Sequence, residues 1–194
     1  MSLKERMYSV LLVSASETVN TAFYSFLPKA TYEPVDTVAS VSAAKRALLD
    51  RSYDLVIINS PLPDDPGIRL AIDICNSGNT VVLIMVRAEL LDEITNKVKM
   101  HGVFVLPKPT SKSIALTALS WMQSARERLR KSEKKTLSLE ERMEEIRIVN
   151  RAKWLLISDL KMSEAEAHRH IEKQAMDKGA TKRSIAEEII KIYT

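Results

Sequence analysis

The chain has 194 residues, of which 45% are hydrophobic, with a formal net charge of +4 and one cysteine. This composition can supply one large or two modest domains, and the lone Cys75 excludes an internal disulfide and is typical of a small buried side chain in a reducing cytoplasm. Because the apolar runs are too short or too polar for a signal peptide or a membrane span, we expect a soluble, cytoplasmic protein.

The charge is unevenly distributed along the chain. Residues 1–120 carry equal numbers of basic and acidic side chains, so the whole excess of +4 lies in residues 121–194. This asymmetry weakly favours an anionic partner for the C-terminal part, and a solvated helical surface would explain it equally well.

Apolar runs alternate with amphipathic stretches from about Val10 to Lys108. The pattern predicts strands at residues 9–16, 32–40, 54–60, 80–86 and 103–109, and helices at 17–27, 41–51, 68–78, 89–102 and from near Ser111. Continuous apolar strands that alternate with helices indicate an α/β fold with a five-stranded, parallel, doubly wound sheet, which we place in residues 1–123.

Residues 116–160 contain no glycine or proline and repeat apolar residues at helical spacing. A heptad register places Met122, Leu129, Met143 and Ile157 at position a, with Ala125, Leu139, Ile146 and Leu160 at position d. Polar residues at other a and d positions predict weak pairing around residues 132–136. We expect a helical, dimerising coiled-coil connector at 124–141, and the alternative is an amphipathic helix packed on its own domain.

Two capping-box patterns follow. Ser138 and Glu141 suggest that a helix restarts or that one long helix has a soft point there. Ser163 and Glu166 predict the start of a further helix, which Gly179 ends, and Thr181 can cap a last one. With the end of the connector they form an all-α three-helix domain at 142–194, whose expected core is Leu155, Leu156, Leu160, Ala167, Ile171, Ala175, Ile185, Ala186 and Ile189.

The stretch DLVIINSPLPDDPG, residues 54–67, ends a buried strand on Asn59 and continues through an acidic, proline-rich turn to Gly67. With Lys108-Pro109 after the fifth strand, this pattern resembles the receiver domain of two-component response regulators, a flavodoxin-like fold, over about residues 8–123. In that family the position of Asn59 holds the phosphoryl-accepting aspartate.

The resemblance implies a pocket without its usual chemistry. The family's paired acids correspond to Ser14 and Ala15, so the oxygen ligands for magnesium are missing, and the amide of Asn59 is a poor nucleophile. We therefore expect a pseudo-receiver that binds no metal or cofactor and is not phosphorylated by the usual route.

Three other positions complete this degenerate pocket. Val86 and Arg87 stand where the family has a sensing hydroxyl, and Lys108 persists, either to hydrogen-bond the Asn59 amide oxygen or because its turn requires it. Two nearby carboxylates, Asp64 and Asp65, are expected to serve the turn and solubility. The candidate pocket comprises Ser14, Ala15, Asn59, Val86, Arg87 and Lys108.

The C-terminal stretches NRAKWLLI (150–157) and MSEAEAHRHIEKQAMDKGATKRSIAEEII (162–190) resemble the ANTAR domain. This RNA-binding antiterminator module occurs at the C-terminus of certain response regulators. The matching positions are mostly apolar, so they indicate the fold more strongly than they indicate RNA contact. The family implies binding to tandem hairpins with six-base loops in nascent transcripts, which prevents formation of a terminator.

RNA loop bases are recognised by stacking on rings or guanidinium groups, while basic side chains hold phosphates. Each candidate has an alternative role: a solvated connector charge for Arg151 and Lys153, a helix ion pair for Lys173, and a half-buried ring for His168. Trp154 could stack on a base, but a tryptophan at helical spacing is more often a packing anchor. His168 and His170 lack a third ligand, so no metal site is expected. The RNA-binding candidates are Arg151, Lys153, His168, Arg169, Lys173, Lys182 and Arg183.

The sequence thus favours a dimeric, phosphorylation-independent RNA-binding antiterminator whose pseudo-receiver serves for dimerisation or for docking a regulatory protein partner. The main alternative is a protein-interaction scaffold of a two-component pathway without RNA binding. A DNA-binding regulator ranks lower because no helix carries a convincing row of base-reading side chains. An enzyme ranks last because no nucleophile, base and orienting group can be assembled.

Overall fold

The computed structural model describes residues 7–193. They form two compact units, with the boundary between Lys131 and Ser132. Each unit has its own hydrophobic core, so we treat the two in turn. Within residues 7–193, no helix combines the length and the apolar composition that a membrane crossing requires.

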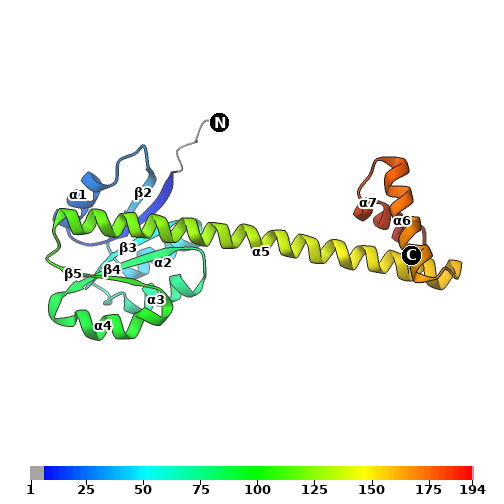
Figure 1. The fold of residues 1–194 in the computed structure, drawn as a ribbon. Helices are drawn as coiled ribbons and strands as arrows, with labels where there is room; N and C mark the ends of the chain where they lie inside the picture. The colour runs from blue at the N-terminus through cyan, green and yellow to red at the C-terminus, as the bar shows by residue number, and fades with distance from the viewer. Residues whose placement is uncertain (1–6, 194) are drawn as a thin grey trace. The chain divides into compact units, whose positions relative to one another are not determined.

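The N-terminal unit is built on one parallel sheet with the strand order β2-β1-β3-β4-β5 (Figure 1). The order reverses direction between β1 and β3, as in doubly wound sheets. This confirms the predicted fold class, and the five predicted strands are all present within a few residues of their expected ends. They are β1 (Tyr8–Val13), β2 (Tyr32–Val38), β3 (Leu55–Asn59), β4 (Val81–Arg87) and β5 (Phe104–Lys108).

Helices connect the strands and cover both faces of the sheet. Ser16 and Ser40 cap the first two helices, accepting hydrogen bonds from the backbone N–H groups of Val19 and Ala43. The predicted helix over 89–102 is shorter than expected, because a 3-10 turn precedes it and another follows it. The elements are α1 (Glu17–Phe26), α2 (Val41–Asp50), α3 (Ile68–Asn76), η1 (Ala88–Leu90), α4 (Leu91–Val98), η2 (Lys99–His101) and α5 (Lys112–Leu160).

The strands bury both faces because they are apolar at consecutive positions. In β1, Leu11 and Val13 pack in the core under α2, α3 and α4, whereas Val10 and Leu12 pack in the core under α1 and the first part of α5 (Figure 1). Successive side chains of a strand point to opposite faces, so a continuous apolar run serves two cores at once.

Helix α5 is a single helix from Lys112 to Leu160. Of the two alternatives for Ser138 and Glu141, the continuous helix is the one observed, and this pair does not start a new helix. The first part of the predicted heptad seam was expected to pair with another helix, but it packs on the sheet of its own unit. Met122 is fully buried against the sheet, and Ala125 and Leu129 pack on the same core, so these three positions are not available for pairing with another helix.

An ion-pair cluster centred on Asp54, just before β3, holds α5 against this unit. Arg126 Nε and Arg130 Nη2 each lie 2.8 Å from Asp54 Oδ1, and the backbone N–H of Ser9 donates to Oδ2 at 3.1 Å. The guanidinium of Arg130 also lies 5.1 Å from the ring centroid of Tyr8. Burial alone would raise the pKa of Asp54, but the hydrogen bond from Ser9 and the two guanidinium groups outweigh it and lower that pKa.

The C-terminal unit packs the end of α5 against α6 (Glu164–Lys178) and α7 (Lys182–Tyr193). Seven of the nine predicted core residues are buried; Leu155 is half-buried and Leu160 is 44% exposed. Leu160 is the last residue of α5, and the positive φ of 57° at Lys161 turns the chain away there. Ala152 takes a place in the core instead. The buried residues are Ala152, Leu156, Ala167, Ile171, Ala175, Ile185, Ala186 and Ile189.

Candidate functional site

The strand register brings the predicted pocket positions together at the carboxyl edge of the sheet. Val13 of β1 pairs with Ile58 of β3, so Ser14 and Asn59 follow side by side. Such an edge is where doubly wound sheets place their sites. Ser14 is 1% exposed and Asn59 is 6% exposed, so the two polar side chains lie within the protein.

Hydrogen bonds fill this pocket. Lys108 Nζ donates to Asn59 Oδ1 at 2.8 Å and to the carbonyl oxygen of Ser60 at 2.5 Å. Asn59 Nδ2 donates to Ser14 Oγ at 3.1 Å, and Ser14 Oγ also accepts from the backbone N–H of Ser16. The predicted bond between Lys108 and the Asn59 amide is therefore present, and the amide uses both of its ends inside the protein.

The remaining positions of the pocket contribute little chemistry. Val86 is buried, Ala15 is exposed, and Arg87 points to solvent with Nη1 3.5 Å from Glu89 Oε1. Burial and then the nearby charge of Arg87 lower the pKa of Lys108. The pocket thus combines neutral side chains with one ammonium group and offers no carboxylate to a metal or a phosphoryl group.

The two acids of the loop after β3 have distinct structural roles. Asp65 Oδ1 accepts from the N–H of Gly67, as expected for a turn residue. Asp64 does more than predicted, because its carboxylate accepts from the backbone N–H groups of Val41 and Ser42 at 2.9 Å and ties the loop to the start of α2. These bonds lower the pKa of Asp64.

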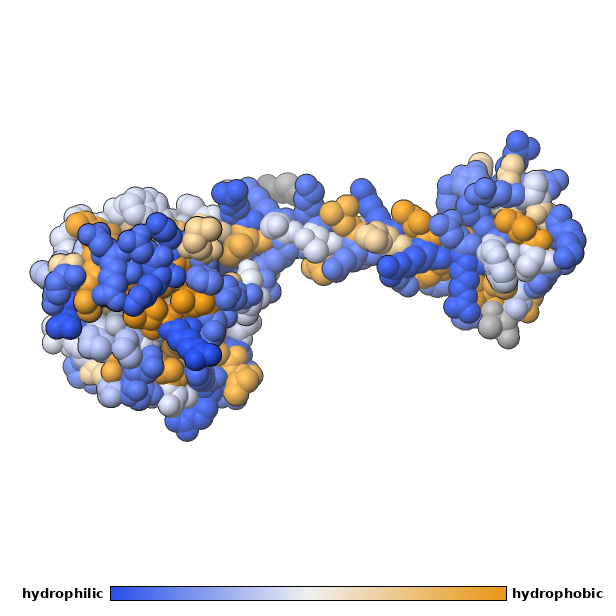
Figure 2. All heavy atoms as spheres, turned by 90° about the horizontal axis from the view of Figure 1, so that it is seen from below, coloured by the Kyte–Doolittle hydropathy of each residue, from blue (hydrophilic) through white to orange (hydrophobic). Residues whose placement is uncertain are grey.

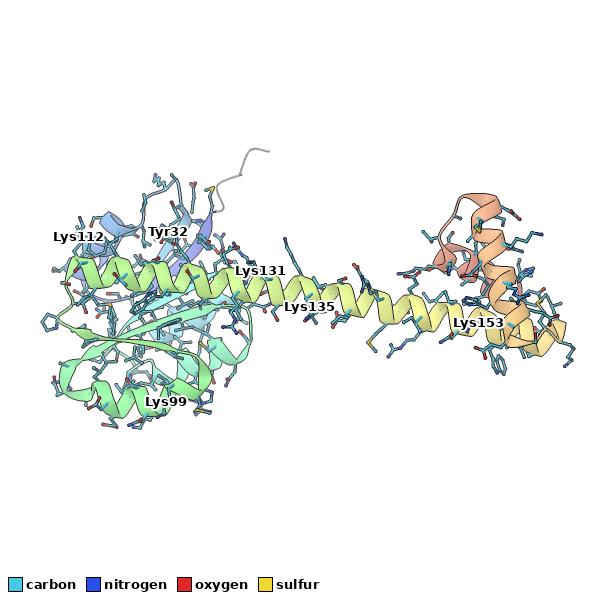
Figure 3. The ribbon with its side chains drawn as sticks, in the orientation of Figure 1. Tyr32, Lys99, Lys112, Lys131, Lys135 and Lys153 are labelled. Atoms are coloured by element: carbon cyan, nitrogen blue, oxygen red, sulfur yellow. The ribbon has the colours of Figure 1, made fainter. Side chains whose placement is uncertain are left out.

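Four of the seven predicted RNA-binding residues contact an acidic side chain within the C-terminal unit. Lys153, on the last turns of α5 (Figure 3), is mostly covered, and its Nζ lies 3.2 Å from Glu164 Oε1. On one flank of α6, Glu172 faces both His168 and Lys182, at 3.3 Å and 2.5 Å. On α7, the fourth residue, Arg183, pairs with the exposed Glu187 one helical turn later, at 3.0 Å.

The other three predicted residues, Arg151, Arg169 and Lys173, are exposed. Arg169 and Lys173 are four residues apart on α6, on the face opposite the buried Ala167 and Ile171. This face of α6 presents two basic groups to solvent.

Trp154 is 65% exposed, so it is not the packing anchor that its helical spacing favoured. The core of this unit takes Ala152 and Leu156 from the other side of α5. The sequence did contain a signal, because the residues three and four positions away from Trp154 are mostly polar: Asn150, Arg151 and Ser158, with only Ile157 apolar.

An exposed apolar stripe precedes Trp154 along α5. Leu139, Met143 and Ile146 are 49%, 56% and 59% exposed, and their spacing places them on one face of the helix. Figure 2 shows apolar side chains at the surface along this part of the helix. Ile157 of the predicted seam packs on the three-helix core instead, so the seam that remains consists of these three residues.

A family model for the ANTAR domain matches residues 137–190. The transcriptional regulatory protein PdtaR of Mycobacterium tuberculosis is 28% identical over 137 residues, which cover 71% of this chain and 67% of that protein. The family model thus supports the C-terminal resemblance.

Solved structures similar to the N-terminal unit are receiver domains and response regulators. The signal receiver domain of an HD domain-containing protein from Pseudomonas fluorescens is 21% identical with a TM-score of 0.58, covering 68% of this chain and 96% of that one. A two-component transcriptional regulator from Clostridium phytofermentans is 16% identical with the same TM-score, over 63% of this chain and 98% of that one. At these identities the likeness is one of fold.

Proposed function

Because the chain joins a receiver fold to a C-terminal ANTAR domain, the arrangement of an ANTAR response regulator, we propose that it is a transcription antitermination regulator that binds RNA hairpin loops as a dimer. The observation that carries the proposal is the exposure of basic and aromatic side chains on two helices of the C-terminal unit: Arg151 and Trp154 on α5, and Arg169 and Lys173 on α6. The match to the ANTAR model supports it, since that family binds nascent transcripts.

The ion pairs of the ANTAR unit are compatible with RNA binding. The side chains of His168, Lys182 and Arg183 are 46–49% exposed, and such exposed contacts with acidic side chains contribute little to stability. A phosphate can therefore replace the glutamate partner of such a group at low cost. Lys153 is 16% exposed and bridges α5 to the start of α6, so its main role in the proposal is to position the RNA-binding surface.

The exposed stripe of Leu139, Met143 and Ile146 supports a dimer. A second copy of the chain in a coiled coil would bury these side chains and bring two ANTAR units together. A dimer of this kind suits tandem hairpins, because binding of the first hairpin places the second unit at a high effective concentration near the second hairpin.

The filled pocket supports control that does not depend on phosphorylation. Asn59 and Lys108 are already hydrogen-bonded to each other, and no acid stands at positions 14, 15 or 59. In the proposal, the receiver fold serves as a docking or dimerisation platform whose state is set by a protein partner.

The test is a salt titration of the full-length protein with an RNA that carries two six-base-loop hairpins, without any phosphodonor. The controls are the same RNA with both loops scrambled and a duplex DNA. We expect tight binding to the intact RNA alone, with an affinity that falls as salt increases. Equal binding to all three ligands would reject loop recognition, and a protein partner captured without RNA would favour the scaffold alternative.

A further inference from the structure

Trp154 is more exposed than Tyr193, the other large aromatic side chain in the described part of the ANTAR unit, and two arginines lie near it. It is 65% exposed, Arg151 lies one turn before it, and Arg147 lies two turns before it on the same face of α5. The Arg147 side chain is 73% exposed, with its guanidinium 3.8 Å from Glu144, at the limit of an ion pair. An indole and two guanidinium groups thus share one solvent-facing strip of helix.

The second tryptophan of the chain is a natural comparison. Trp121, in the receiver unit, is 59% exposed, but the residues three and four positions away from it are Thr117, Ala118, Ser124 and Ala125. Exposure of an indole alone therefore does not distinguish the two sites. The arginine one turn away does, because Arg151 places beside Trp154 the positive charge that a nucleic acid backbone requires, whereas the exposed Arg128 lies two turns from Trp121.

We propose that Trp154, with Arg147 and Arg151, forms a stacking site for one unpaired base of the bound RNA. Bases have two apolar faces that stack on an indole, and guanidinium groups either extend the stack or hold the neighbouring phosphates. This inference rests on the proposed function and adds to it a specific role for Trp154, Arg147 and Arg151.

The charges around Trp154 favour RNA over a second protein helix as its partner. The stripe of Leu139, Met143 and Ile146 is apolar and suits a helix, because the centres of protein interfaces are depleted of charge. The strip that holds Trp154 carries two arginines instead. The two surfaces thus differ in chemistry on the same helix, and each has its own partner in the proposal.

Fluorescence can observe this site directly. The variant Trp121→Phe leaves Trp154 as the single tryptophan of the full-length protein. Titration with the tandem-hairpin RNA should quench its emission at the same RNA concentrations at which binding is detected with a fluorescently labelled RNA. The reciprocal variant Trp154→Phe, which leaves only Trp121, should show little quenching under the same conditions.

Affinity measurements complete the test. Trp154→Ala should weaken RNA binding about tenfold to a hundredfold, the usual range for loss of one stacked base. Trp154→Phe should retain part of the affinity, and Trp121→Ala should bind like the original protein. Sedimentation should give the same mass for all of these variants, which separates stacking from dimerisation.

The outcomes distinguish the inference from the function on which it rests. Tight RNA binding that neither quenches Trp154 nor changes in Trp154→Ala would overturn the stacking site and leave the RNA-binding function intact. A loss of affinity accompanied by a loss of dimer mass would also overturn it, because Trp154 would then act in the protein interface. Absence of RNA binding by the original protein would reject both.

Discussion

A side-chain amide has nearly the shape of a carboxylate, but at position 59 it makes different bonds. The Asn59 Nδ2 donates to Ser14, whereas a carboxylate there would have no proton to donate and would attract cations. Lys108 then satisfies the amide oxygen. At the scale of single residues, the pocket is therefore closed by hydrogen bonds among one ammonium, one amide and one hydroxyl group, without a carboxylate.

Restoring the acid alone should not restore phosphorylation. In Asn59→Asp the new carboxylate would pair with Lys108, and the positions of Ser14 and Ala15 would still lack magnesium ligands. We expect no covalent phosphoryl group by intact-protein mass spectrometry after incubation with a small phosphodonor and Mg²⁺. The triple variant Ser14→Asp, Ala15→Asp, Asn59→Asp should acquire one, and a phosphoryl adduct on the single variant would contradict the prediction.

The Asp54 cluster predicts a pH dependence of stability. Since the folded-state pKa of Asp54 lies below its ordinary value of about 4, its contribution is fully present above that value and is lost as the pH falls through the folded-state pKa. Asp54→Asn should lower the free energy of unfolding by about 2 kcal/mol at pH 7, and this difference should shrink as the pH falls through the folded-state pKa.

Urea unfolding followed by Trp121 fluorescence in a Trp154→Phe background would measure this change in the receiver unit. The control is Glu93→Gln, which removes an exposed pair with Lys97. That control should change stability little, because both of its side chains are more than half exposed. If both substitutions lowered the free energy of unfolding equally, Asp54 would contribute no more than an exposed ion pair does.

At the scale of elements, the sequence predicted the positions of the strands well. It predicted less well what each face of the long helix α5 packs against. The strands are buried on both faces, so nearly every position is apolar and the signal is continuous. The heptad pattern was ambiguous, because Met122, Ala125 and Leu129 fit the spacing for a partner helix and equally fit packing on the sheet. Local spacing reports that a face is buried and does not report what covers it.

The two capping-box patterns can be compared directly, because only the one at Ser163 caps a helix. Ser163 Oγ accepts from the N–H of Glu166, and the Glu166 carboxylate accepts from the N–H of Ser163, whereas Ser138 lies inside the continuous α5. Ser163→Ala should cost about 1 kcal/mol of stability in the ANTAR unit, while Ser138→Ala should cost nothing, since alanine favours a helix interior. Urea unfolding followed by Trp154 fluorescence in the Trp121→Phe variant would measure both. Equal losses would mean that α5 has an end near Ser138.

The exposed stripe predicts how the chain associates. Met143→Glu with Ile146→Glu would place charges in the proposed seam and should raise the dimer dissociation constant at least about a hundredfold, since each buried apolar side chain contributes about 1.5–3 kcal/mol. Sedimentation equilibrium would measure the change in mass. Met100→Glu, on a residue that is 86% exposed in the receiver unit, is the control and should leave the dimer unchanged. A monomeric original protein would reject the seam.

At the scale of the dimer, an RNA with two hairpins should bind more tightly than an RNA with one. Scrambling one of the two loops should lower the affinity of the original protein about a hundredfold. The variant Met143→Glu, Ile146→Glu should bind both RNAs weakly and equally in a gel-shift titration. If it still distinguishes the two RNAs, pairing through α5 is not what couples the two sites.

The residues of the proposed RNA-binding surface were the least predictable part of the molecule. Arg151, Arg169 and Lys173 could be chosen for their charge, but charge does not indicate which groups are already paired, as Lys153 is with Glu164. Trp154 was assigned to the core because apolar rings usually pack. The mostly polar residues one turn away from Trp154 indicated an exposed face, but they carried less weight in the prediction than the usual burial of apolar rings.

The bond between Lys108 and Asn59 also affects how long a response of the proposed regulator lasts. A phosphorylated receiver switches itself off, because its acyl phosphate hydrolyses and a phosphatase can hasten the loss. A hydrogen bond between an ammonium and an amide has no such decay and needs no ATP to form. In the proposed regulator, therefore, a response lasts as long as the protein molecule itself or its complex with a partner, and synthesis and degradation set its duration.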